Sequence, residues 1–120
     1  MNTKDWLEKI GMVIDAQDSD AFASYFIEDG IFRFGNNDPV QGKQNIRNYV
    51  DQFFNMIDNS KHKVINFWEK DDSIVWQGEV LYTRLDVKKV NINFTNILYM
   101  KGDLIKEYLI YIDNTPLFAV

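Results

Sequence analysis

Apolar residues in the first part of the chain recur at the spacing of an α-helix. Trp6, Ile10 and Val13 are four and three residues apart, which places them on one face. This pattern predicts a helix from about residue 3 to residue 16. Asp18 to Asp20 then supply capping oxygens for a second, shorter helix. We expect that helix to end at residues 28–30, where a glycine favours a left-handed C-terminal residue.

A short strand and a third helix follow in the pattern. Residues 31–35 alternate, with Phe32 and Phe34 on one face, which predicts a strand. Residues 36–42 contain Asn-Asn-Asp-Pro and a closing glycine, which indicates a loop. A third helix is predicted from about residue 43 to residue 57, and its apolar stripe needs a covering layer.

From Lys61 onward the apolar period changes to two. Turn residues at positions 70–72, 86–89 and 101–103 separate four long strands. Connections this short permit only antiparallel neighbours, so the second half is a meander. Long strands in a small sheet twist and curl. The fold class is therefore α+β, with three N-terminal helices packed on one face of a curled antiparallel sheet.

Composition narrows the class of protein. The 120 residues are 46% apolar and 15% aromatic, which suits one domain over residues 1–120 with a core and a lined pocket. The net charge of -5 and the scattered lysines exclude the basic surface of a nucleic-acid binder. We also expect no membrane segment, because no stretch approaches 18 apolar residues. A charged N-terminus and the lack of cysteine point to the cytoplasm.

The order of elements resembles the nuclear transport factor 2-like superfamily, and within it the SnoaL-like domains. The segments that carry the resemblance are residues 23–30, 32–36, 40–42, Trp68, 78–86 and 110–113. The resemblance implies a cone-shaped curved sheet with the helices on its concave face, and a homodimer. It is strong for fold but not for activity, because this fold carries many activities.

The catalytic patterns of known relatives match poorly. Ketosteroid isomerases, which the chain resembles more distantly, carry a tyrosine, a general-base aspartate and a protonated aspartate. These positions fall near Ile10, Phe34 and Asn96, so the base and the phenol are missing. The Asp-Arg-Asp set of limonene-epoxide-hydrolase-like members is only partly matched, by Arg84-Leu85-Asp86.

Three titratable residues are candidate catalytic groups. His62 is the only histidine, and histidine is the residue type that titrates near neutral pH. Between Lys61 and Lys63 it also suits an exposed strand start. Glu79 interrupts an apolar strand. If it faces inward, burial raises the pKa of a carboxyl toward a catalytic value, and the alternative is an ion pair.

Asp113 ends the last strand and is either an acid/base group or a turn-initiating residue. Strand alternation and the resemblance together predict which residues line the pocket. The candidate ligand-binding residues are Trp68, Asn96, Tyr111, Phe34 and Phe94. One bulge would invert part of this assignment. No metal site, phosphate-binding loop or nucleophile motif is expected, and no cofactor.

Three functions remain open from the sequence. The first is an acid/base isomerase, cyclase or lyase acting on a small apolar, oxygenated substrate, for which we expect a cavity of roughly 300 Å³ or more. The second is a carrier or sensor of an apolar ligand without turnover. The third is a dimerisation domain. The homodimer is expected through the outer sheet face, with Val80, Tyr82, Ile97 and Tyr99 on it.

Overall fold

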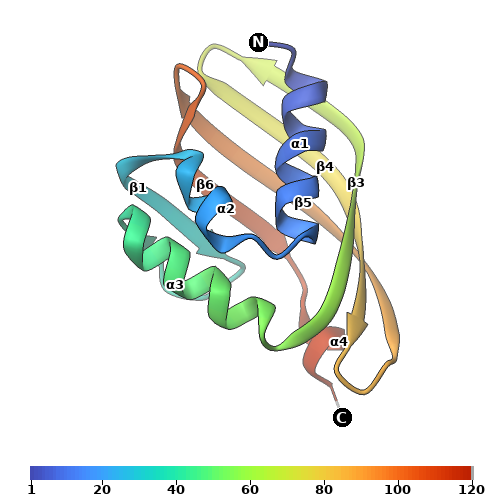
Figure 1. Ribbon diagram of the computed structural model, residues 1–120. Helices are drawn as coiled ribbons and strands as arrows, with labels where there is room; N and C mark the ends of the chain where they lie inside the picture. Colours follow the sequence, from blue (N-terminus) through green and yellow to red (C-terminus); the bar gives the residue numbers. More distant parts are fainter. Residues whose placement is uncertain (120) are drawn as a thin grey trace.

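The computed structural model describes residues 1–119 and shows an α+β fold built on a curved, unclosed sheet (Figure 1). The sheet has six strands in the order β2-β1-β6-β5-β4-β3. Three helices from the first half of the chain lie over one of its faces. The elements are α1 (Thr3–Asp15), α2 (Ser19–Ser24), β1 (Phe26–Phe34), β2 (Val40–Gln41), α3 (Lys43–Phe54), β3 (Ile57–Lys70), β4 (Ser73–Arg84), β5 (Lys89–Lys101), β6 (Leu104–Ile112) and α4 (Thr115–Phe118).

The C-terminal half is the antiparallel meander that the sequence predicts. β3 pairs with β4, β4 with β5 and β5 with β6, all antiparallel. The expectation of a wholly antiparallel sheet is wrong at one place, because β1 pairs with β6 in parallel. This pairing is possible because the rest of the meander connects the two strands, and parallel neighbours need a long connection.

The second helix is shorter than predicted, and the first strand begins earlier. α2 ends at Ser24, and β1 starts at Phe26. The Tyr25 carbonyl oxygen accepts a hydrogen bond of 2.7 Å from the Ile105 backbone N–H. Phe26 is completely buried. Pairing with β6 thus holds residues from Phe26 onward in an extended strand, although their apolar spacing favoured a helix. α3 also ends earlier, at Phe54, and α4 was not predicted.

Capping and apolar faces explain the two helices at the start of the chain. Asn2 Oδ1 accepts a 3.1 Å hydrogen bond from the Asp5 N–H, and Asp18 Oδ1 accepts one of 3.0 Å from the Ala21 N–H. The capping role expected near Asp18 is therefore confirmed. Leu7 and Ile10 of α1 are completely buried against the sheet. These contacts fix α1 along β3.

A bulge in β3 shapes the sheet. The register of β3 against β4 shifts between Val64 and Asn66, opposite Gly78. A Cβ atom at Gly78 would lie 2.4 Å from both the Lys63 carbonyl oxygen and Phe94 Cζ. Only glycine fits there, and the Phe94 ring packs into the space that it leaves. The bulge bends the strand and changes the face to which later β3 residues point.

No helix in residues 1–119 is long and apolar enough to cross a membrane.

The β4–β5 turn contains a strained residue. Val87 has φ = 65°, and the residue is 78% exposed. A β-branched residue in the left-handed region costs about 1–2 kcal/mol. We expect Val87→Gly to raise the free energy of unfolding by about 1 kcal/mol, after allowing for the entropy that glycine adds to the unfolded chain. Thermal unfolding should show a higher Tm.

Lys88→Gly is the matched control, because Lys88 does not have a positive φ and should only lose stability. An unchanged or lower Tm for Val87→Gly would show that the turn stores no such strain.

Candidate functional site

The concave side of the sheet and the helices enclose a cavity with an almost entirely apolar, aromatic lining. Its volume open to a water-sized molecule is about 50 Å³, well below the roughly 300 Å³ expected for a small-molecule pocket. The cone is therefore mostly filled, but it is not solid. The lining residues are Ile14, Phe22, Phe32, Phe34, Tyr49, Val50, Phe53, Phe54, His62, Val80, Tyr82, Phe94, Asn96, Tyr108, Ile110 and Ile112.

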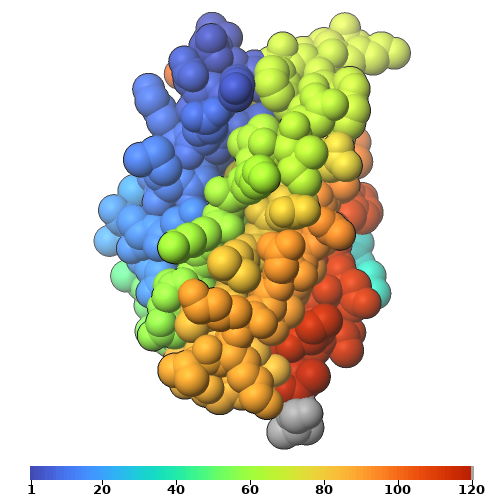
Figure 2. All heavy atoms as spheres, turned by 90° about the vertical axis from the view of Figure 1, so that its right-hand side faces the viewer, coloured from blue at the N-terminus to red at the C-terminus, as the bar shows by residue number. Residues whose placement is uncertain are grey.

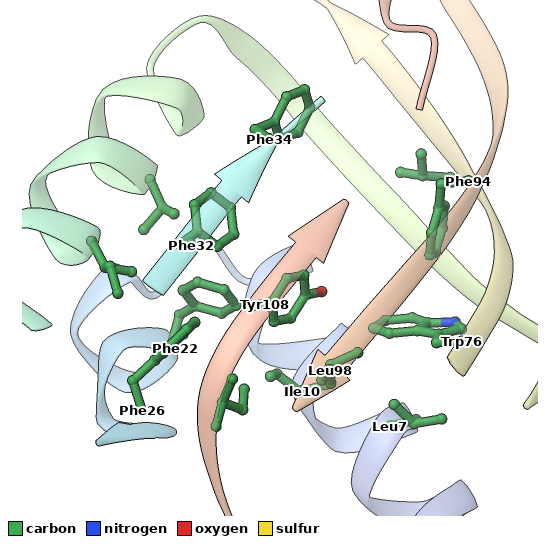
Figure 3. Close-up of a cluster of buried hydrophobic side chains, with 14 of the residues drawn as sticks. Leu7, Ile10, Phe22, Phe26, Phe32, Phe34, Trp76, Phe94, Leu98 and Tyr108 are labelled. Carbon is green, nitrogen blue, oxygen red and sulfur yellow. The ribbon is translucent and has the colours of Figure 1, made fainter. Parts of the chain in front are cut away.

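Alternate residues of four strands provide most of this lining. Phe32 and Phe34 project from β1, and Phe94 and Asn96 project from β5. The aromatic rings pack edge to face, as Phe22 and Phe32 do with ring centroids 5.7 Å apart. In Figure 3 the rings of Phe22, Phe32 and Tyr108 lie together, and those of Phe94 and Trp76 form a second group on the other side of the core.

His62 joins this cavity to a carboxylate at the end of α1. His62 Nδ1 lies 2.5 Å from Asp15 Oδ1. The His62 backbone N–H donates a 2.7 Å hydrogen bond to Asp15 Oδ2, and Ser60 Oγ donates one of 2.9 Å to Oδ1. The His62 and Asp15 side chains are only 11% and 24% exposed. The carboxylate therefore holds the imidazole in one orientation.

These contacts keep the Asp15 carboxylate ionised. Burial alone raises the pKa of this carboxyl, but the hydrogen bonds and charge of His62 and the hydrogen bond from Ser60 outweigh it, so the pKa of Asp15 lies below its ordinary value. The Asp15 charge has a further effect on the buried phenols of Tyr82 and Tyr108. Burial is the main cause of their raised pKa, and Asp15 adds to it. Both phenols therefore remain protonated donors.

A buried amide completes the polar part of the wall. Asn96 is 2% exposed, and its Nδ2 donates a 3.1 Å hydrogen bond to the Tyr108 hydroxyl. Figure 3 shows this hydroxyl pointing toward the side of the core that carries Phe94 and Trp76. Within residues 1–119, Asn96 Oδ1 and Trp76 Nε1 are buried without a hydrogen-bond partner. Asn96 and Trp76 face each other on β5 and β4.

The structure brings four of the residues singled out from the sequence to the cavity. His62, Asn96, Phe34 and Phe94 all line it. Their placement agrees with the expectation, and their roles in binding or chemistry remain predictions.

The inward placement of Glu79 is wrong. On β4 the buried positions are even-numbered, including Trp76, Val80 and Tyr82, and Glu79 points to the opposite face. There it lies between Lys63 and Asn93 of the neighbouring strands. No ion pair of Glu79 with Arg33 or Arg84 forms in the part of the chain that the structure describes. The same parity moves Val80 and Tyr82 from the outer face to the cavity wall.

Trp68, Tyr111 and Asp113 also lie outside the cavity. Trp68 follows the β3 bulge, which turns it outward, and it is 53% exposed. Tyr111 is 58% exposed, since Tyr108, Ile110 and Ile112 are the β6 residues that face in. Asp113 Oδ1 accepts a 3.1 Å hydrogen bond from the Thr115 N–H. Hydrogen bonds from Thr115 lower the pKa of Asp113, so this residue is the turn initiator.

The sequence reasoning missed Asp15, Tyr82 and Tyr108. Asp15 occupies the last position of α1, where a polar residue suggests a helix end and gives no sign of a partner 47 residues away. Tyr82 and Tyr108 follow the strand alternation once the faces of β4 and β6 are known. In the described range 1–119, no three His, Cys, Asp or Glu side chains cluster closely enough to hold a metal ion.

Comparisons with known proteins agree with the fold. The sequence pattern of the SnoaL-like domain matches residues 6–108. No curated protein matches the sequence. An NTF2-like protein of unknown function from Burkholderia pseudomallei is 11% identical and superimposes with a TM-score of 0.88, covering 100% of this chain and 99% of that one.

Two further crystal structures are similar. A protein from Catenulispora acidiphila with a ketosteroid isomerase-like fold, solved in complex with trimethylamine, is 12% identical with a TM-score of 0.86, covering 93% of this chain and 88% of that one. A candidate SnoaL-like polyketide cyclase from Shewanella putrefaciens is 13% identical with a TM-score of 0.81, covering 96% and 92%. At these identities the likeness shows the fold alone.

The contacts of Asp15 lead to a prediction about stability. Because its pKa is lower in the folded state than in the unfolded state, ionised Asp15 stabilises the fold above the unfolded value near 3.8. That contribution disappears as pH falls through the lower folded value. Asp15→Asn should cost about 2 kcal/mol at pH 7, or roughly 5–10 °C in Tm.

Thermal unfolding of both proteins from pH 7 to pH 2.5 measures this effect. The Tm difference should shrink as pH falls below 4, where Asp15 gains a proton in the folded protein. A difference that persists at pH 2.5 would show that the charge of Asp15 is not its cause.

Proposed function

The chain belongs to the SnoaL-like domain family, and from that premise we propose that it is an acid/base isomerase, cyclase or lyase for a small apolar, oxygenated substrate. The proposal depends on one observation. The imidazole of His62 is held through Nδ1 by Asp15, and the same ring forms part of the wall of an aromatic cavity.

The proposal gives each imidazole nitrogen a role, and the contact of Nδ1 with Asp15 supports it. Because Asp15 occupies Nδ1, Nε2 is the nitrogen that can exchange a proton with a ligand. The carboxylate selects the tautomer with a proton on Nδ1 and stabilises the imidazolium that forms when Nε2 accepts a proton. A histidine–carboxylate pair of this kind needs no cofactor for proton transfer.

The other polar groups of the wall suit an oxygen atom that gains negative charge. The hydroxyls of Tyr82 and Tyr108 stay protonated, because burial raises their pKa. Hydrogen-bond donors in an apolar, water-poor cavity stabilise a developing oxyanion more strongly than they would in water. The cavity therefore supports removal of a proton from carbon next to a carbonyl or similar oxygenated group.

The size of the cavity limits the substrate. About 50 Å³ holds only a few water molecules, so a larger ligand must displace side chains of the wall. Tyr49 and Phe53 of α3 are only partly buried against the core, so their rings are candidates to move aside. The substrate class that fits is a compact molecule with one or two oxygen atoms.

A second candidate function is ligand binding without turnover. It is favoured by the predominantly apolar lining and by the position of Glu79 and Asp113 outside the cavity. A small amine also suits an aromatic cavity through cation–π contacts, and the Catenulispora acidiphila neighbour was solved with trimethylamine. Trimethylamine therefore belongs in a binding screen beside small ketones.

Proton exchange on a simple ketone tests the enzymatic proposal. Cyclopentanone in D₂O should exchange its α-hydrogens faster with the protein than with buffer alone, as followed by NMR. His62→Gln should reduce the protein-dependent rate by about 10²–10⁴-fold, because the proton acceptor is lost. Glu79→Gln is the matched control and should leave the rate unchanged, since Glu79 lies on the outer face.

Suppose that cyclopentanone or trimethylamine binds, but the α-hydrogens of cyclopentanone exchange no faster than in buffer. The carrier function then replaces the enzymatic one. Exchange that survives in His62→Gln would contradict the role of the imidazole.

We also propose a homodimer through the outer sheet face. One residue from each of β3, β4, β5 and β6 lies opposite its neighbour on the next strand. Together they form an apolar row across the sheet, made of Trp68, Val75, Ile97 and Leu109. Trp68 is exposed, and the other three are half-buried. Such a row is costly to leave in water and suits a self-complementary contact.

Sedimentation velocity at micromolar concentration tests the dimer. The wild-type protein should sediment as a dimer and Ile97→Glu as a monomer, because the charge falls in the middle of the row. Asn93→Asp, on the same face but outside the row, should remain dimeric. A monomeric wild-type protein would exclude this interface.

A further inference from the structure

A second hollow lies on the other side of His62, between α1 and β3. Figure 2 shows the face of the molecule on which α1, in blue, runs beside β3, in green. The groove between them has a volume of about 350 Å³, compared with about 50 Å³ for the inner cavity, so it has room for many water molecules. Its lining residues are Leu7, Glu8, Gly11, Met12, Asp15, His62, Lys63, Val64 and Trp76.

His62 is the link between the groove and the inner cavity. Its side chain lines both hollows, whereas Asp15 lines only the groove. The Nδ1 atom, bound to Asp15, is therefore on the groove side of the imidazole. The ring and its carboxylate together form a wall with solvent on one side and the aromatic cavity on the other.

The groove is kept open by a glycine in the middle of α1. Gly11 costs about 1 kcal/mol of helix stability relative to alanine. A Cβ atom there would lie 3.6 Å from His62 Cβ and 3.7 Å from Trp76 Cη2, which are ordinary contact distances. Alanine would thus fit, but any longer side chain would occupy the groove above the imidazole.

We propose that the groove between α1 and β3 is the route by which protons and water from solvent reach His62, separate from the route of the ligand. The proposal builds on the acid/base function of His62 given above. When Nε2 takes a proton from the ligand, the imidazolium carries one proton on each nitrogen. The Nδ1 proton then passes to a water molecule of the groove, while the Asp15 carboxylate stays ionised and holds the ring in place.

The ring is then neutral, with its proton on Nε2. When Nδ1 takes a proton back from groove water, Nε2 can deliver its own proton to another atom of the ligand. The starting tautomer is restored, and the ligand has gained as many protons as it lost. The imidazole thus exchanges protons with solvent while ligand and aromatic side chains fill the cavity.

Deuterium exchange at the imidazole Cε1 position tests this route without any substrate. His62 is the only histidine, so mass spectrometry of its peptide reports a single ring. The plateau rate at alkaline pH is compared, because exchange occurs when hydroxide takes the Cε1 proton from the protonated ring, so its rate depends on the access of solvent hydroxide to the imidazole. Gly11→Leu fills the groove, and Met12→Trp covers it from the exposed rim, where Met12 is 70% exposed.

We expect both groove variants to slow the plateau exchange at least tenfold. Two controls should stay within twofold of wild type. Gly11→Ala leaves the groove open, and Val80→Ile adds a methylene to the cavity side, opposite His62 on β4. Met12→Trp changes only a surface residue, so it keeps the test valid if Gly11→Leu disturbs the packing of α1.

Two results overturn the proposal. If Val80→Ile slows the exchange and the groove variants do not, solvent reaches His62 through the cavity. If no variant changes the rate, the groove is not the route. The proposed enzymatic function is judged separately, since ketone exchange that depends on His62 can persist when either of these results is obtained.

Discussion

The hydrogen bonds between the Asp15 carboxylate and β3 fix the position of α1 and of the His62 imidazole beside the cavity. The carboxylate accepts hydrogen bonds from the Ser60 hydroxyl, the His62 backbone N–H and the His62 ring. These bonds connect the end of α1 to the edge strand of the sheet. A buried carboxylate is costly unless such donors surround it. Satisfying this charge fixes the helix, the strand and the imidazole together, and it leaves one ring nitrogen free for a ligand.

The aromatic core limits the space beside the imidazole. Rings from α2, β1, β5 and β6 fill most of the cone and leave only a narrow cavity. This packing stabilises the fold and removes water from the neighbourhood of Tyr82, Tyr108 and Asn96. The same dryness that makes those groups effective donors also restricts the ligand to a small molecule that can displace aromatic side chains. Under the proposed function, the wall suits a compact, oxygenated ligand, and the proposed proton route lies on the side of His62 that faces α1.

The sequence predicts the meander and the first and third helices well, because turn chemistry and helical spacing are local signals. It does not predict the faces of β4 and β6. Both faces of these strands carry apolar residues: Val75 and Leu109 lie outside, and Trp76 and Ile110 lie inside. Alternation alone therefore cannot choose the buried face, and Glu79 and Tyr111 were assigned to the wrong one. Trp68 was misplaced by the β3 bulge, and the partner of His62 was invisible because Asp15 is distant in sequence.

The tautomer of His62 is the most direct test of this account. A ¹⁵N NMR spectrum of the single, labelled histidine distinguishes a proton on Nδ1 from a proton on Nε2 in the neutral ring. We expect the Nδ1–H tautomer, with a hydrogen-bonded ring proton that is lost in Asp15→Asn, and a shift of the Nε2 resonance when cyclopentanone binds. A neutral ring that carries its proton on Nε2, unaffected by Asp15→Asn, would contradict it.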